Sequence, residues 1–139
     1  GWKCIYAPKA VVYHMHSASA GTYSPFKAFL VERNRIWLQV KCFPLLLLLY
    51  GQFYTFFRYA YQAYGALAGK GASGEFTKEH SKMQLIKVLL KVYHSALKGM
   101  PLMLKKRRAI QKGRLLSTSR VFALLKRFGI GTKDISLRG

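Results

Sequence analysis

Hydrophobic residues recur every three or four positions from about residue 26 onward, the spacing that places them on one face of an α-helix. The first such stretch carries Phe26, Phe29, Leu30, Ile36, Trp37, Val40 and Phe43. Ser24 and Pro25 mark its start, because serine caps a helix and proline fits the first turn. Pro44 cannot continue a helix. The pattern therefore predicts one long amphipathic helix that ends near Pro44.

The second helical stretch, residues 45 to about 67, is apolar and aromatic on nearly all sides. Residues 42–57 carry no charge, and tyrosines stand at positions 50, 54, 59, 61 and 64. A membrane-spanning helix needs about 20 apolar residues, and tyrosine prefers the headgroup region. We therefore expect a segment that lies in a membrane interface. A buried helix of a soluble core and a spanning helix are the alternatives.

Smaller elements are predicted beyond the apolar stretch. Glycines and small residues indicate a linker over residues 69–76. A third helix is predicted over residues 77–97. Its apolar stripe consists of Met83, Ile86, Leu89, Leu90, Tyr93 and Leu97. Pro101 begins a further short helix, and the last one, residues 119–128, ends before Gly129, a usual helix stop.

Two short strands are predicted near the N-terminus, at residues 5–7 and 10–14, with a turn at Pro8. Two short strands do not form a stable sheet alone, so we interpret them as the edge of a larger domain. The fold prediction is therefore mainly α with a short N-terminal β remnant. It divides the chain into residues 1–23 (strands and loop), 24–68 (two long helices), 69–76 (linker) and 77–139 (basic amphipathic helices).

The composition is basic and apolar at once. Of 139 residues, 24 are Lys or Arg and 4 are Asp or Glu, which gives a formal net charge of +20. Hydrophobic residues make up 51% of the chain, too many for a disordered basic tail. Four carboxylates are too few for a paired acid–base site or an oxygen-ligand metal cage. Cys4 and Cys42 match neither a zinc spacing nor a disulfide framework, so we expect a reducing compartment.

So high a charge indicates a polyanionic partner, either an anionic membrane surface or a nucleic acid. A basic cluster follows two amphipathic helices and consists of Lys105, Lys106, Arg107, Arg108, Lys112 and Arg114, of which the first four are the predicted membrane-binding residues. Such clusters are attracted to anionic lipids. Nucleic-acid binding favours aromatic rings interleaved with basic residues, whereas here the rings gather at residues 50–64 and the charges at 105–127. We therefore expect membrane binding, with nucleic acid as the weaker alternative.

Two histidines are candidate binding residues. His14 and His16 project from the same side of the predicted strand, so together they can face a metal ion or a phosphate. Such a pair also occurs for structural reasons alone. Ser17 and Ser19 follow in a loop that leads to a helix N-terminus, where backbone N–H groups favour phosphate. An ordinary strand-to-helix turn has the same composition.

Arg33 falls on the apolar stripe of the first long helix, a position that is costly unless a carboxylate or a bound anion meets it. Glu32 can pair with Arg35 one helical turn further on. An ordinary local ion pair explains this group as well as a binding site does.

Three segments resemble bacterial family 2 glycosyltransferases, with the rhamnosyltransferase-like members nearest. Residues 1–19 (GWKCIYAPKAVVYHMHSAS) are similar to the closing segment of their catalytic domain, where a Val-x-His strand precedes a Ser/Thr-rich loop. Residues 32–35 (ERNR) and 41–44 (KCFP) resemble the following helix, with Cys42 in place of the usual Asn. Residues 97–101 and 105–111 look like the basic C-terminal tail of the same family.

The resemblance implies that this chain is the C-terminal part of an α/β GT-A glycosyltransferase, followed by amphipathic membrane-associated helices. The whole inverting enzyme would transfer a sugar from a nucleotide-diphosphate donor to a lipid-linked or polysaccharide acceptor. It would do so at the cytoplasmic face of the bacterial plasma membrane. The family's D-x-D metal motif and its catalytic Asp are missing from this sequence. We therefore expect an inactive fragment, with the Mg or Mn ion held mainly by a preceding part.

The resemblance also assigns roles to single residues. His14 matches the family's Val-x-His histidine, near the donor diphosphate and the metal, so it is also a candidate metal ligand. His16, Ser17 and Ser19 belong to the adjoining loop. Arg33 and Arg35 match the arginines of the ERNR helix, which implies docking of the diphosphate or the acceptor. The alternative is a non-catalytic basic helical protein that binds a membrane or a nucleic acid.

Overall fold

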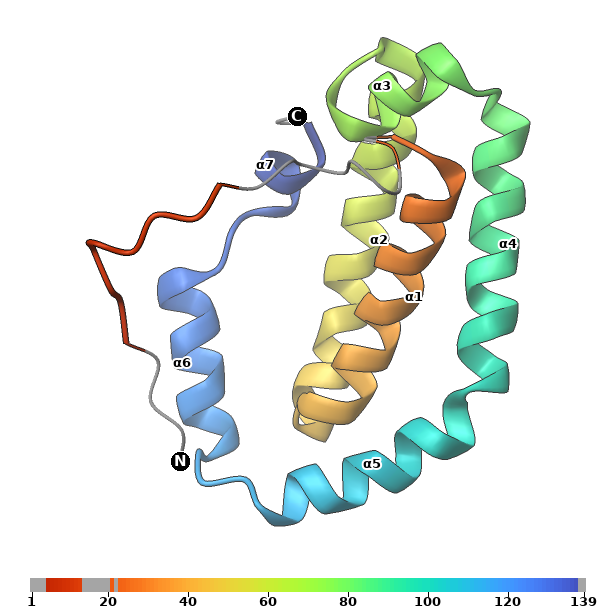
Figure 1. Cartoon of the computed structure of the whole chain (residues 1–139). Coiled ribbons are helices and arrows are strands. Elements are labelled where there is room, and N and C mark those ends of the chain that lie inside the picture. The colour runs from red at the N-terminus through yellow and green to blue at the C-terminus, as the bar shows by residue number, and fades with distance from the viewer. Residues whose placement is uncertain (1–4, 14–20, 22, 138–139) are drawn as a thin grey trace.

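The computed structural model describes residues 5–13, 21 and 23–137, and this part of the chain is mainly helical, as predicted. Figure 1 shows the order of the helices along the chain. Their bounds are α1 Pro25–Cys42, α2 Leu45–Ala68, α3 Gly71–Glu79, α4 Lys82–Lys98, α5 Met100–Lys112, α6 Thr118–Phe128 and α7 Thr132–Leu137.

The two long helices α1 and α2 form an antiparallel hairpin at the centre of the molecule (Figure 1). Helix α1 packs closely against α4 and α5, and α2 packs against α3 and α7. Helix α5 crosses the end of the hairpin where α1 turns into α2, and α6 stands on the other side of α2 from α4 (Figure 1). The hairpin is therefore the frame on which the smaller helices are placed.

The ends of the long helices follow from local chemistry. The Ser24 hydroxyl accepts a hydrogen bond from the Lys27 N–H at 3.2 Å, and Pro25 occupies the first turn of α1. Helix α1 ends at Cys42, two residues before Pro44, and α2 begins directly after this proline. Helix α2 ends at Ala68, and the residue that caps this end, Gly69, has a φ of 67°, the left-handed conformation that favours glycine. The predicted bounds of both helices are confirmed.

The core is small and lies largely on the side of α4 that faces α1. Val88, Val92 and Ala96 are spaced four residues apart and are at most 7% exposed. Trp37 of α1 packs against this side, and its indole N–H donates to the Ala96 carbonyl at 3.2 Å. The predicted apolar stripe of this helix is not the part that forms the core. Its large members Met83, Ile86, Leu90 and Leu97 are exposed, because the small side chains are the ones that let α4 approach α1.

The predicted linker over residues 69–76 is also corrected, because α3 begins at Gly71. The glycines here serve close packing. A Cβ atom on Gly74 would lie 2.3 Å from the carbonyl carbon of Gly69, and one on Gly71 would lie 2.3 Å from the Ser136 carbonyl oxygen. Small residues therefore allow α3 to fold back onto the end of α2 and onto α7.

The predicted strands are absent from residues 5–13. The turn is present, since the Ala10 N–H donates to the Ala7 carbonyl at 3.1 Å, but the flanking residues form no sheet. Two short strands without a neighbouring sheet have no partner to pair with. The helix predicted over 77–97 is divided, because Ser81 caps a new helix. Helix α7 was not predicted, whereas α5 and α6 lie where the sequence placed them.

Candidate functional site

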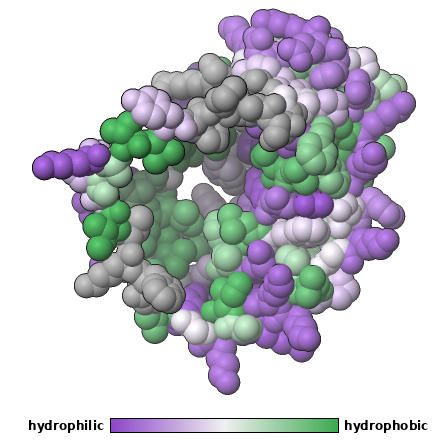
Figure 2. All heavy atoms as spheres, in the orientation of Figure 1, coloured by the Kyte–Doolittle hydropathy of each residue, from purple (hydrophilic) through white to green (hydrophobic). Residues whose placement is uncertain are grey.

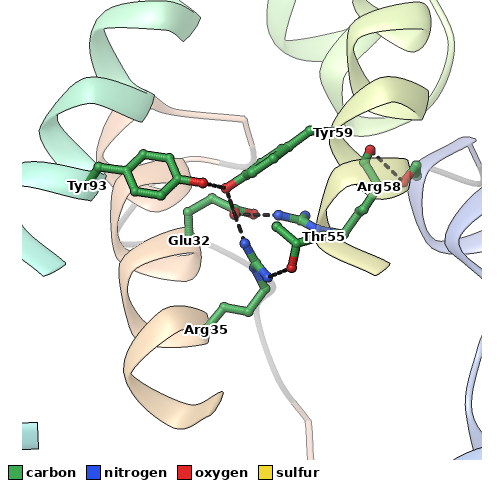
Figure 3. Close-up of polar contacts among 7 residues, drawn as sticks. Glu32, Arg35, Thr55, Arg58, Tyr59 and Tyr93 are labelled. Carbon is green, nitrogen blue, oxygen red and sulfur yellow. Dashed lines mark hydrogen bonds and ion pairs between the residues drawn. The ribbon is translucent and has the colours of Figure 1, made fainter. Parts of the chain in front are cut away.

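A partly buried polar cluster joins α1, α2 and α4, and Glu32 of α1 is at its centre (Figure 3). One oxygen of Glu32, Oε2, accepts from Arg58 Nη2 at 2.5 Å, from the Tyr59 hydroxyl at 3.1 Å and from Arg35 Nε at 3.2 Å. Arg35 also donates to the Thr55 hydroxyl at 3.2 Å and to Tyr59 at 3.1 Å. The Tyr93 hydroxyl of α4 donates to Tyr59 at 3.4 Å.

The electrostatics of the cluster favour an ionised Glu32. Burial raises the pKa of this carboxyl, but the hydrogen bond and the charge of Arg58, together with Arg35 and Tyr59, lower it further, so the pKa lies below its ordinary value. Burial raises the pKa of Tyr59, as do the bond from Tyr93 and the charge of Glu32. Two arginines share one carboxylate, so the cluster holds a net charge of +1 inside the hairpin.

The arginines of the ERNR segment have different surroundings. The predicted pair of Glu32 with Arg35 is confirmed at 3.2 Å. Arg33 was expected to need a buried anion, and this expectation is corrected. Its guanidinium stacks over the rings of Trp37 and Phe29, at 4.4 and 5.1 Å from their centroids, and donates to the Asn34 side chain. Aromatic faces therefore take the place of the anion.

The basic cluster of α5 does not act as one surface. Arg107 Nη1 donates to the carbonyls of Val40 and Phe43, at 2.6 and 2.7 Å, and so satisfies the end of α1. Lys105, Lys106 and Arg108 are exposed. Three of the four predicted membrane-binding residues are thus placed to meet a partner, and the fourth holds α5 against the hairpin.

The outer face of α2 is apolar and exposed. It consists of Leu45, Leu46, Leu49, Tyr50, Phe53, Phe56, Phe57, Tyr64 and Leu67, which are 52–72% exposed. The only charged residue of this helix, Arg58, is 7% exposed and lies on the inner side. The helix therefore shows the reverse of the pattern expected for a surface helix in water.

Two cavities border α2. One, of about 590 Å³, lies between the start of α2, helix α5 and the start of α6. The other, of about 610 Å³, lies between α2 and α6, where Tyr50 meets Phe122 edge to face at 5.9 Å and the Tyr54 hydroxyl donates to the Ile130 carbonyl. Figure 2 shows apolar side chains around the hollow beside α6, and hydrophilic ones along α4 and α5.

The remaining predicted site residues, His14, His16, Ser17 and Ser19, lie outside the described residues. Within the described ranges, no group of three or more His, Cys, Asp or Glu side chains is arranged to hold a metal ion. The sequence analysis missed Arg58 and Tyr59 as partners of Glu32. A lone charge in an otherwise apolar helix was the signal that pointed to Arg58.

Among the helices that the structure describes, none has the length and the apolar character needed to cross a membrane. No protein-family model, curated protein or solved structure matches this chain.

Proposed function

We propose that this chain binds the surface of an anionic membrane, as the membrane-associated C-terminal part of a family 2 glycosyltransferase. The observation that carries the membrane role is the reversed pattern of α2. Its charge is buried among hydrogen-bonding partners, and its large apolar side chains are exposed over the whole length of the helix.

The energies involved favour an apolar neighbour for this face. Removing one Leu or Phe side chain from water stabilises a protein by roughly 1.5–3 kcal/mol. Seven Leu or Phe side chains and two tyrosines are exposed on this face of α2, and a large exposed apolar patch is typical of an interaction surface. The interface of a bilayer accepts leucine and phenylalanine below the headgroups and tyrosine among them. A helix that lies flat on the membrane therefore satisfies the whole face at once.

Helix α4 adds a second amphipathic surface. Met83, Ile86, Leu90 and Leu97 are exposed, and the exposed lysines 87, 91 and 98 belong to the same helix. Lysine stems can lie along apolar surface while the ammonium groups reach lipid phosphates. Each basic residue near an anionic surface contributes about 1 kcal/mol of attraction at physiological salt.

The glycosyltransferase role is supported by the resemblance of residues 1–19 and 32–44. On this proposal the whole enzyme takes a sugar from a nucleotide-diphosphate donor, with a Mg or Mn ion, and passes it to a lipid-linked or polysaccharide acceptor. His14, His16, Ser17, Ser19, Arg33 and Arg35 are the proposed binding residues. Arg35 is held by the Glu32 cluster, so a ligand must compete for it, whereas Arg33 has no carboxylate partner among the described residues.

Flotation with liposomes tests the membrane role. We expect the purified chain to float with anionic vesicles and to float less with neutral ones. High salt should weaken its binding to anionic vesicles without abolishing it, because salt screens only the charges. Resistance to alkaline carbonate without dependence on lipid charge would indicate a spanning segment instead. A chain that never floats would contradict the proposal, and α2 would then face another protein domain.

The transferase role is tested in the full-length enzyme. We expect His14→Ala to lower kcat/KM at least about tenfold, equivalent to ~1.4 kcal/mol of transition-state stabilisation, with His16→Ala milder. The chain of 139 residues alone should show no turnover with any nucleotide sugar, because it lacks the family's metal motif and base. Turnover above a boiled control, or normal kinetics of a well-folded His14→Ala enzyme, would contradict this role.

A further inference from the structure

The cavity of about 590 Å³ at the start of α2 has one basic wall and one apolar wall. The basic wall is formed by Arg107 and Arg108 of α5 and by Arg114, which follows that helix. The apolar wall is formed by Leu45, Leu46 and Leu104. Two chemically different walls around one cavity suit a ligand that is itself amphiphilic.

The basic wall has no acidic side chain beside it in the part of the chain that the structure describes. Within the described residues, none of its three arginines is within ion-pair distance of a carboxylate, and Arg108 has no hydrogen-bond partner either. The guanidinium of Arg114 donates to the Thr118 hydroxyl at 3.2 Å. Like charges that share a cavity repel one another unless an anion neutralises them. The guanidinium fork suits phosphate oxygens, which it can bind in pairs.

The start of α2 adds to the positive potential. Pro44 occupies the N-cap position, no side chain caps this end, and the first turn carries no acidic residue. The first N–H groups of a helix lack partners within the helix, and its dipole is positive there. Pro44 and Leu45 both line the cavity, so this helix end faces the same space as the arginines.

The apolar wall is continuous with the surface that we assign to the membrane. Leu45 and Leu46 are the first members of the outer face of α2 and are more than 60% exposed. None of the described residues that line the cavity is aromatic, so these residues offer no platform on which a nucleic-acid base could stack. An acyl chain, in contrast, can leave the cavity along the leucines and enter the bilayer on which α2 lies.

We propose that this cavity binds the phosphate headgroup of an anionic phospholipid, with the phosphate between Arg108 and Arg114 and an acyl chain along Leu45 and Leu46. The inference rests on the proposed membrane binding and names the lipid contact within it. Arg107 has a positioning role, because its Nη1 donates to carbonyls at the end of α1 and so holds the basic wall of α5 in place. The site therefore recognises a phosphate attached to a hydrocarbon chain, in addition to charge in general.

A pair of charge-matched variants tests the site. The first, Arg108→Gln with Arg114→Gln, removes two charges from the cavity. The second, Lys105→Gln with Lys106→Gln, removes two exposed charges of α5 that do not line the cavity. Binding to phosphatidylcholine vesicles that contain phosphatidic acid is measured by titration, and circular dichroism checks the helix content of each variant.

We expect the arginine variant to lose at least about tenfold more affinity than the lysine variant, because it loses charge-assisted hydrogen bonds as well as attraction. Arg108→Lys with Arg114→Lys keeps the charge and should still bind more weakly than the original chain, since lysine cannot bind phosphate with a fork. Inorganic phosphate at millimolar concentration should compete no better than chloride of equal ionic strength.

Equal losses in the two charge-matched variants would overturn the site while leaving membrane binding intact. The site would also be wrong if Arg108→Lys with Arg114→Lys kept the full affinity for the vesicles. Effective competition by inorganic phosphate would overturn it as well, because the hydrocarbon chain would then contribute nothing. If the original chain binds none of the vesicles, the proposed function on which this site rests is wrong instead.

Discussion

The inner face of α2 carries an arginine and a threonine that are both buried, whereas its outer face carries leucine, phenylalanine and tyrosine side chains that are exposed. Both inner residues have partners in the chain, because Arg58 donates to Glu32 of α1 and Thr55 accepts from Arg35 of α1. Among the described residues, the Nε atom of Arg58 is the one buried side-chain polar atom without a hydrogen-bond partner. The outer residues stay more than half exposed, although Tyr50 contacts Phe122 of α6. The comparison shows that the polar side of one helix can find its partners within the chain while the apolar side still requires a partner outside it.

The largest effect should come from breaking the inner face. Arg58→Ala leaves Glu32 buried with fewer partners, and removing one member of a buried ion pair destabilises proteins by about 3–5 kcal/mol. Urea unfolding followed by circular dichroism measures the loss. Arg33→Ala is the matched control, since Arg33 stacks on rings at the surface of α1 and pairs with no carboxylate in the described residues. Equal losses from both variants would show that the cluster is not what holds α2 to α1.

The outer face should respond in the opposite way. Phe53→Ser with Phe56→Ser should leave the free energy of unfolding nearly unchanged, because both side chains are already exposed. It should lower the affinity for anionic vesicles at least about tenfold, since each buried phenylalanine contributes roughly 1.5–3 kcal/mol. Val11→Ser with Val12→Ser removes exposed apolar side chains outside the helices and serves as the control. Unchanged vesicle affinity of the phenylalanine variant would argue against the role of this face.

The smallest effect is the dependence of stability on pH. The folded-state pKa of Glu32 lies below its ordinary value of 4.5, so its ionised form stabilises the fold above that pH. This contribution is lost as the pH falls below 4.5 toward the folded-state pKa. Urea midpoints measured from pH 6 downward should fall in this range, and Glu32→Gln should flatten the fall. A Glu32→Gln chain with the same pH profile would assign the acid sensitivity to other groups.

The helix pattern was predictable wherever local signals agreed. Ser24, Pro25 and Pro44 defined α1, and Gly129 defined the end of α6, because caps and breakers act within a few residues. The division between α3 and α4 escaped prediction, since Ser81 stands in a stretch whose apolar spacing continues on both sides. The helical state of residues 71–76 depends on contacts of Gly71 with Ser136 and of Gly74 with Gly69, which sequence spacing does not reveal.

The candidate site was predictable only in part. The pairing of Glu32 with Arg35 follows from their positions one turn apart on a helix. The contacts of Arg58 with Glu32 and of Arg107 with the end of α1 join residues 26 and 64–67 positions apart, so they depend on how the hairpin and α5 pack. The apolar stripe of α4 was visible in the spacing of its residues, but a periodic pattern does not show what covers an apolar face, and most of the stripe is exposed.

Spin labels along the outer face of α2 test the central claim most directly. The chain first receives Cys4→Ser and Cys42→Ser, and a single cysteine at position 49, 56 or 67 then carries the label. Each label reports whether its position is accessible to oxygen in lipid or to a water-soluble relaxation agent. On anionic vesicles, we expect all three labels to become protected from the aqueous agent and to lie at a similar shallow depth, because α2 lies flat in the interface. Labels that stay accessible to water on vesicle-bound protein, or a depth that changes steadily from position 49 to 67, would contradict this account.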